Sequence, residues 1–209
     1  MKMAASRASG LVLLTVVTGF ILGGAGLWLG IAEGIIALWG FGIACFLQVP
    51  PALSLRGRIS GGLGNIGLER ERVTLRVVSH LLRLLALGMA LASIAALMGD
   101  GPPPPQASLI TLGLATLAPG LLAALWLAKR DLTGIHPALD LDAARTRTLL
   151  ELAVLLLAGS LLGRWFPWAD AVTGLLLALR LFLEGRTLAK GSTLPAAACG
   201  GCGSGCGCG

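Results

Sequence analysis

Six apolar blocks, each near the length of a membrane-spanning helix, follow one another along the chain. Crossing a bilayer takes about 20 mostly apolar residues. The blocks end at proline, glycine or charged residues, as expected where a helix leaves the lipid. They run from Gly10 to Leu29, Ile31 to Val49, Val77 to Met98, Ala107 to Ala128, Ala143 to Gly163 and Ala169 to Leu183. This pattern predicts an all-α polytopic membrane protein with six transmembrane helices.

The first two blocks are separated by no charged residue, so their boundary is drawn at glycines. Gly23, Gly24, Gly26 and Gly30 could form a tight hairpin there. The pairs Gly19/Gly23 and Gly26/Gly30 also have the GxxxG spacing that lets helices approach closely in lipid. Two interpretations stay open: packing of the first two spans against each other, or a gate or dimer face.

Lysine and arginine predict the orientation. Of the sixteen basic residues, thirteen fall before the first block, between the second and third, between the fourth and fifth (or at the mouth of the fifth), and after the sixth. The loops on the opposite side hold Arg164 alone. Cytoplasmic loops carry such an excess, so both termini are expected in the cytoplasm. Lys2 and Arg7 precede a run that we expect to be a retained helix rather than a cleaved leader.

Composition narrows the class of protein. Of 209 residues, 56% are hydrophobic and 12% are charged, against about 25% charged in average chains. These values exclude a disordered chain, a small disulfide scaffold and an ordinary water-soluble domain. They leave a transmembrane domain over residues 1–190 and a Gly/Cys-rich cytoplasmic tail over residues 191–209. The expected location is a bacterial cytoplasmic (inner) membrane.

Two function classes are not expected. The net charge of +6 is spread between apolar blocks, so no basic patch for nucleic acid emerges. No Ser/His/Asp set and no pair of neighbouring carboxylates is evident within the spans, so no enzyme is predicted. The expected partners are the lipid bilayer and a metal ion.

Ionisable groups inside the blocks are costly in lipid and therefore call for an explanation. One interpretation is a polar transport pathway, and the other is a set of structural charge pairs, in which Arg180 and Glu184 pair along one helix and Arg83 neutralises Glu151. His80 is then a hydrogen-bonded packing residue. The pathway candidates are Glu33, His80, Asp142 and Glu151, and the charge-pair candidates are Arg83, Arg145, Arg180 and Glu184.

Four cysteines close to the C-terminus carry the most specific local chemistry. Cys199 and Cys202 form CxxC, and Cys206 and Cys208 form CxC, all joined by glycine. Two such thiolate pairs can surround one soft ion, so Zn²⁺ or Cu(I) is expected. A reducing cytoplasm favours free thiols there. A low-complexity or lipidated tail is the alternative. Cys45, inside the second block, is expected to be a buried thiol.

Three segments resemble the cation diffusion facilitator family of metal exporters. Trp165-Phe-Pro-Trp-Ala-Asp170-Ala-Val-Thr-Gly174 is similar to that family's entry into helix six. Residues 67–71 and 136–143 are similar to its approaches to helices three and five. The resemblance covers residues 10–190 and implies a six-helix transmembrane domain, divalent cation efflux and a homodimer.

The expected metal ligands are missing from the matching positions. The family holds its ion between a pair of ligands on helix two and a His/Asp pair on helix five. The positions that match the helix-five pair fall near Arg145 and Leu149 in this chain. Residues 36–45 contain no Asp, Glu or His. His136 and Asp140 have HxxxD spacing but lie ahead of the helix, interrupted by proline.

Two hypotheses follow. In the first, the protein is a divergent metal transporter whose ion enters from the cysteine tail. In the second, it is a scaffold or accessory subunit of a larger membrane complex that has lost the transport site. Arg145 motivates the second hypothesis, because a fixed positive charge could replace the missing ion. Arg145 is then expected within salt-bridge reach of Asp142 or Glu151.

Overall fold

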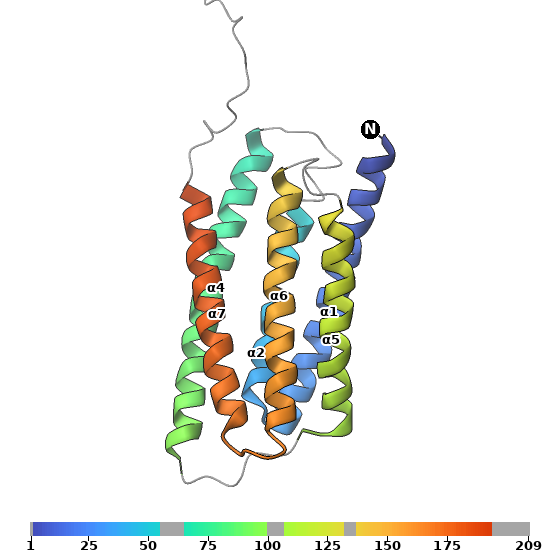
Figure 1. The fold of residues 1–209 in the computed structure, drawn as a ribbon. Helices are drawn as coiled ribbons and strands as arrows, with labels where there is room; N and C mark the ends of the chain where they lie inside the picture. The colour runs from blue at the N-terminus through green and yellow to red at the C-terminus, as the bar shows by residue number, and fades with distance from the viewer. Residues whose placement is uncertain (1, 55–64, 100–106, 132–136, 194–209) are drawn as a thin grey trace, which may run out of the picture.

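A computed structural model describes residues 2–54, 65–99, 107–131 and 137–193, and all regular structure in these ranges is helical (Figure 1). The helices are α1 (Lys2–Glu33), α2 (Ile36–Leu47), α4 (Asn65–Met98), α5 (Leu109–Arg130), α6 (Pro137–Leu162) and α7 (Ala169–Thr193). A one-residue turn at Gln48 ends α2, and residues 49–54 are helical again. The expectation of an all-α chain is confirmed.

The six helices run alternately up and down in one bundle (Figure 1). The start of α1 and the end of α7 lie at the same end, called here the upper end, and the turn over residues 163–168 lies at the lower end. The closest packing joins α1 to α2, α5 to α6, and α4 to α7. Helix α2 also contacts α4, α6 and α7, so it forms the centre of the bundle.

Four helical segments are long and apolar enough to cross a bilayer: Gly10–Glu33, Ile36–Ser54, Arg72–Met98 and Leu109–Arg130. Helices α6 and α7 have the required length but carry more charged side chains. Large apolar side chains face outward over much of the bundle, including Trp28, Leu84 and Ile110. Such an exterior is compatible with an integral membrane protein.

Aromatic side chains gather where a membrane surface would lie. Trp165 and Trp168 are exposed in the turn at the lower end, and the ring of Trp168 packs 5.2 Å from that of Phe166. Near the upper end of α5, the guanidinium of Arg130 lies 5.8 Å from the ring centre of Trp126. Tryptophan is enriched at both membrane interfaces, which agrees with the presence of tryptophan near both ends of the bundle.

Several expected boundaries are corrected by the structure. Helix α6 begins at Pro137 rather than Ala143, and α7 ends at Thr193 rather than Leu183. The turn between the first two helices lies at Gly34, whose φ of 68° is left-handed, and not at Gly30. Helix α4 begins at Asn65, twelve residues before the expected start at Val77. Several arginines that were assigned to a loop therefore belong to the first turns of this helix, including Arg70, Arg72 and Arg76.

The glycines of α1 serve contact with α2. A Cβ at Gly30 would lie 2.3 Å from the backbone nitrogen of Trp39, and one at Gly26 would lie 3.3 Å from Cα of Gly42. A Cβ at Gly42 would in turn lie 2.5 Å from the nitrogen of Leu27. Backbones this close leave no room for a side chain, so packing within the chain accounts for the GxxxG spacing.

We expect Gly30→Ala to destabilise the bundle by about 1–3 kcal/mol, because its methyl group would overlap the backbone of α2. Gly24→Ala is the matched control on the same helix, since its Cβ would come no closer than 4.0 Å to the Phe46 ring. Thermal unfolding in detergent measures both variants. Equal melting temperatures for the two variants would contradict this close approach.

Candidate functional site

A carboxylate from α7 caps the start of α2 at the lower end. Asp170 accepts hydrogen bonds from the backbone N–H groups of Ile36 at 3.0 Å and Ala37 at 3.2 Å. The first N–H groups of a helix have no partner within that helix. The residue that precedes α2, Ile35, has no side-chain group to cap them. Asp170 therefore joins the start of α7 to the start of α2.

A second carboxylate joins α1 to α5 at the same end. Glu33 accepts hydrogen bonds from the Ser108 hydroxyl at 2.5 Å and from its backbone N–H at 3.2 Å. The Ser108 hydroxyl in turn accepts one from the N–H of Thr111 at 3.2 Å, as an N-cap residue does. These bonds give Glu33 a structural role at the end of the bundle.

Buried polar side chains form a cluster in the upper half of the bundle, called here the polar core. It draws on the turn after α2 and on α5, α6 and α7, and all of its side chains are buried. Its members are Gln48, Lys129, Asp142, Arg145, Thr146 and Glu184. Charged groups are rarely buried unless they are paired, so each contact in this cluster matters for folding.

The strongest contact of the polar core is an ion pair between α5 and α6. Lys129 Nζ lies 2.6 Å from Asp142 Oδ2, and their side chains are 2% and 7% exposed. The same ammonium donates a hydrogen bond to the Thr146 hydroxyl at 2.7 Å. Lys129 lies in the last turn of α5 and Asp142 near the start of α6, so the pair closes the upper end of this hairpin.

The polar core continues on the other side of α6. Glu184 of α7 accepts a hydrogen bond from the Gln48 side chain at 3.2 Å. Among the described residues, no group donates to its second oxygen, Oε2, which is also buried. Arg145 and Arg180 lie close enough to act electrostatically on this carboxylate. Glu184 is therefore held by one hydrogen bond and by the field of two guanidinium groups.

A small cavity lies against Gln48 and Thr146 of the polar core. Its volume is about 10 Å³, and its lining includes Thr18, Gln48 and Thr146. A cavity of this size holds about one water molecule when polar groups line it. The cavity offers no room for a hydrated ion.

A lateral groove opens on the outside of α6 at mid-height. Its volume is about 510 Å³, and it is lined by Trp126, Arg147, Leu150, Glu151, Val154 and Arg180, among others. Arg147 Nε lies 3.2 Å from Glu151 Oε1, four residues further along α6. Arg180 of α7 pairs with the other oxygen of Glu151. Both arginines therefore share one carboxylate.

The structure changes several expected pairings. Arg180 pairs with Glu151 on α6 rather than with Glu184 on its own helix, and Glu184 is buried rather than reaching the interface. Arg83 donates to the backbone oxygen of Gly185 at 3.4 Å instead of neutralising Glu151. These differences arise from the orientation of α6 and α7 about their own axes. In the bundle, Glu184 of α7 faces Gln48 at the end of α2, and Glu151 of α6 faces the groove.

Three further expectations concern Arg145, His80 and Asp142. Arg145 points into the bundle rather than toward the cytosol, near Lys129 and Glu184. His80 is exposed on α4, so it lines no interior pathway and packs in no core. Asp142 and its partner Lys129 both lie in the link expected between the fourth and fifth blocks, and the structure instead places them in helices, with both side chains buried.

Metal ligands do not converge in the described part of the chain. Over residues 2–54, 65–99, 107–131 and 137–193, no three His, Cys, Asp or Glu side chains come together to hold an ion. Cys45 is buried within α2, as expected. The proposed ligands Cys199, Cys202, Cys206 and Cys208 lie outside the described residues, as does His136.

Comparison of this chain with known proteins does not assign it to a family. No protein-family model matches this chain, and no curated protein is significantly similar to it. The resemblance to cation diffusion facilitators therefore stays a prediction.

Three residues of the site were missed in the sequence: Lys129, Gln48 and Asp170 as a helix cap. Lys129 and Asp142 had a visible signal, since opposite charges flank a short link between two predicted helices. Gln48 is an amide next to two prolines at the end of an apolar block, which gave no sign of a buried partner. The cap at Asp170 depends on a contact across 134 residues.

Replacing Asp142 by Leu should destabilise the protein by about 3–5 kcal/mol, because the buried ammonium of Lys129 would lose its counter-charge. The double variant Lys129→Met/Asp142→Leu removes both charges and should recover most of that loss. Denaturant unfolding in detergent gives the coupling between the two sites. Additive effects of the two single substitutions would show that the pair does not stabilise the fold.

Proposed function

We propose that this protein is a six-crossing integral membrane scaffold that carries a soft-metal-binding tail at the cytoplasmic surface. The observation that carries the proposal is the Lys129–Asp142 ion pair. Its buried carboxylate, on the helix where the resembled exporters hold their cation, already has a fixed ammonium as its partner. The bundle then needs no transported ion to neutralise this group.

The remaining interior charges support the same function. Three guanidinium groups serve the other two carboxylates: Arg145 lies near Glu184, Arg147 pairs with Glu151, and Arg180 lies near both. A site that releases and rebinds a divalent cation requires several carboxylate, imidazole or thiolate ligands that face one point. Here the carboxylates lie apart, and each has protein cations beside it. A scaffold or accessory subunit of a membrane complex fits this arrangement.

The cysteine tail supplies the binding chemistry in this proposal. Cys199, Cys202, Cys206 and Cys208 offer four thiolates, the number that Zn²⁺ takes in structural sites. The helix that precedes them, α7, ends at the upper end of the bundle, the same end at which α1 begins (Figure 1). Under the proposed orientation the tail therefore lies in the cytosol, where thiols stay reduced.

The metal content of the purified full-length protein tests the tail. After exposure to Zn²⁺ and removal of excess metal, about one ion per chain is expected by elemental analysis. Replacing the four tail cysteines by Ser should abolish binding, whereas Cys45→Ser is the matched control and should bind normally. Metal retained by the four-Ser variant, or none bound by the unaltered protein, would contradict the proposal.

Metal efflux is the second candidate, and Glu184 favours it. This carboxylate is buried, and one of its oxygens has no hydrogen-bond donor among the described residues. Such an oxygen could take part in a transient cation or proton site. If transport occurs, Glu184→Gln should remove it, because the amide carries no charge.

Proteoliposomes separate the two functions. The scaffold proposal predicts that Zn²⁺ and Co²⁺ enter vesicles that contain the protein no faster than they enter protein-free vesicles. The opposite result is uptake that exceeds that of protein-free vesicles, is lost in Glu184→Gln and is kept in the control Glu33→Gln. That result would contradict the scaffold proposal and support a transporter.

A further inference from the structure

The lateral groove is an open apolar surface with arginine side chains in its lining, and no other part of the described chain fills it. Among the lining residues, Arg147 and Arg180 carry two positive charges and Glu151 carries one negative charge. Because Arg180 also acts on the buried Glu184, the charge left without a counter-charge of its own is that of the exposed Arg147. The rest of its lining is apolar, from Trp126 and Leu150 down to Val154 and Leu155. An excess charge beside lipid is costly, so it requires an anion or access to the membrane surface.

The depth of each charge follows from helix geometry. Asp142 is level with Lys129 at the end of α5, and Arg147 follows it by five residues, or about 7 Å along the axis. Arg147 is 67% exposed, so its guanidinium can extend toward the headgroups of the upper leaflet. Glu151 and Arg180 lie about one turn deeper. The groove therefore joins the headgroup region to the acyl-chain region.

We infer that the lateral groove binds an acidic phospholipid of the upper leaflet. Its phosphate would pair with Arg147, below the Trp126–Arg130 contact at the interface. One acyl chain would then run along Leu150 and Val154 toward the lower end. A volume of about 510 Å³ suits a headgroup with the first part of a chain. Basic pockets between transmembrane helices are known sites for such headgroups.

Charge complementarity favours this lipid over a second copy of the chain. A symmetric dimer through the groove would bring two identical surfaces together, each with one excess positive charge. A zwitterionic lipid would gain little, because its ammonium would meet the same arginines. The inference depends on the bundle lying in a membrane, and it is independent of the cysteine tail.

Quenching of Trp126 fluorescence by brominated lipids tests the site. The full-length protein is placed in phosphatidylcholine vesicles with a minor fraction of phosphatidylglycerol, and either lipid carries the bromines. The Trp126 signal is the difference between this protein and Trp126→Phe. We expect phosphatidylglycerol to be preferred about five-fold at the groove, from one added arginine–anion contact.

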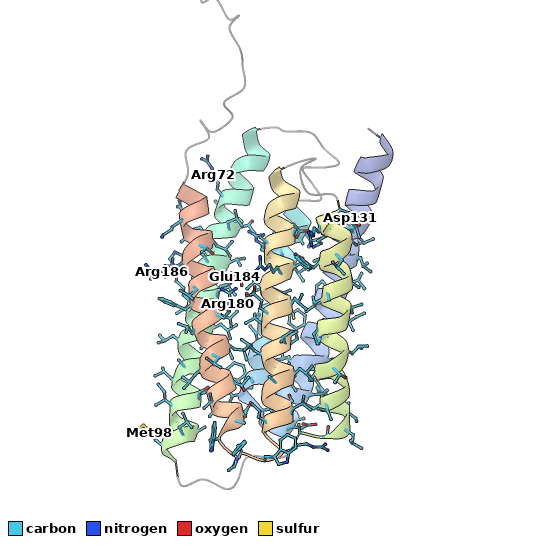
Figure 2. The ribbon with its side chains drawn as sticks, viewed as in Figure 1. Arg72, Met98, Asp131, Arg180, Glu184 and Arg186 are labelled. Atoms are coloured by element: carbon cyan, nitrogen blue, oxygen red, sulfur yellow. The ribbon has the colours of Figure 1, made fainter. Side chains whose placement is uncertain are left out.

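Matched variants show whether the preference comes from the groove. Arg147→Gln should reduce it by about five-fold, whereas Arg186→Gln should leave it unchanged. Figure 2 shows Arg186 on the side of α7 away from α6, and Arg180 between the two helices. Glu151→Gln should strengthen the preference, because it frees both arginines from their internal counter-charge. A purely structural role for Glu151 predicts no such gain.

Three results would overturn the inference. Quenching by each brominated lipid in proportion to its share of the vesicle would show a lipid-facing groove without selectivity for acidic headgroups, and the membrane embedding would stand. Equal effects of Arg147→Gln and Arg186→Gln would assign the preference to overall charge. No quenching by either lipid would mean that a protein, such as a second copy, covers the groove.

Discussion

Pairing of opposite charges inside an apolar bundle is the constraint on which this structure depends. Helices α6 and α7 carry Asp142, Arg145, Glu151, Arg180 and Glu184, and in lipid each would be costly alone. The bundle rotates these side chains toward one another and toward Lys129 and Gln48. This pairing allows α6 and α7, which carry more charge than the other helices, to pack in one bundle with the four apolar segments.

The two ends of the bundle are fixed by different chemistry. At the lower end, carboxylates from α1 and α7 hold the starts of α5 and α2, where unpaired N–H groups and the helix dipole favour negative charge. At the upper end, an ammonium and a carboxylate close the α5–α6 hairpin. Long-range contacts at both ends limit the sliding of helices past each other.

The sequence predicted the six helices well, because apolar block length and glycine or proline boundaries are local properties. It located the first turn incorrectly, since Gly30 and Gly34 look alike until contact with Trp39 distinguishes them. It named Asp142, Glu151 and Glu184 among its candidates, but the expected pairs of Glu151 with Arg83 and of Glu184 with Arg180 differ from the structure, where Arg147 and Arg180 pair with Glu151. Partner choice depends on how each helix is rotated within the bundle, which spacing along a single helix cannot supply. Lys129 illustrates this, because only packing against α6 turns a loop-end lysine into a buried one.

Labelling of cysteines from one side of the membrane tests most directly whether α6 and α7 both cross it. Single cysteines at positions 131 and 164 are introduced into a chain whose own cysteines are Ser, and an impermeant maleimide is added to right-side-out vesicles. The account predicts labelling of Arg164→Cys from outside, and labelling of Asp131→Cys only after the vesicles are opened. A chain with the native tail cysteines should behave like Asp131→Cys. Labelling of both introduced cysteines from the same side would contradict the crossing of α6, and a tail labelled from outside would contradict that of α7.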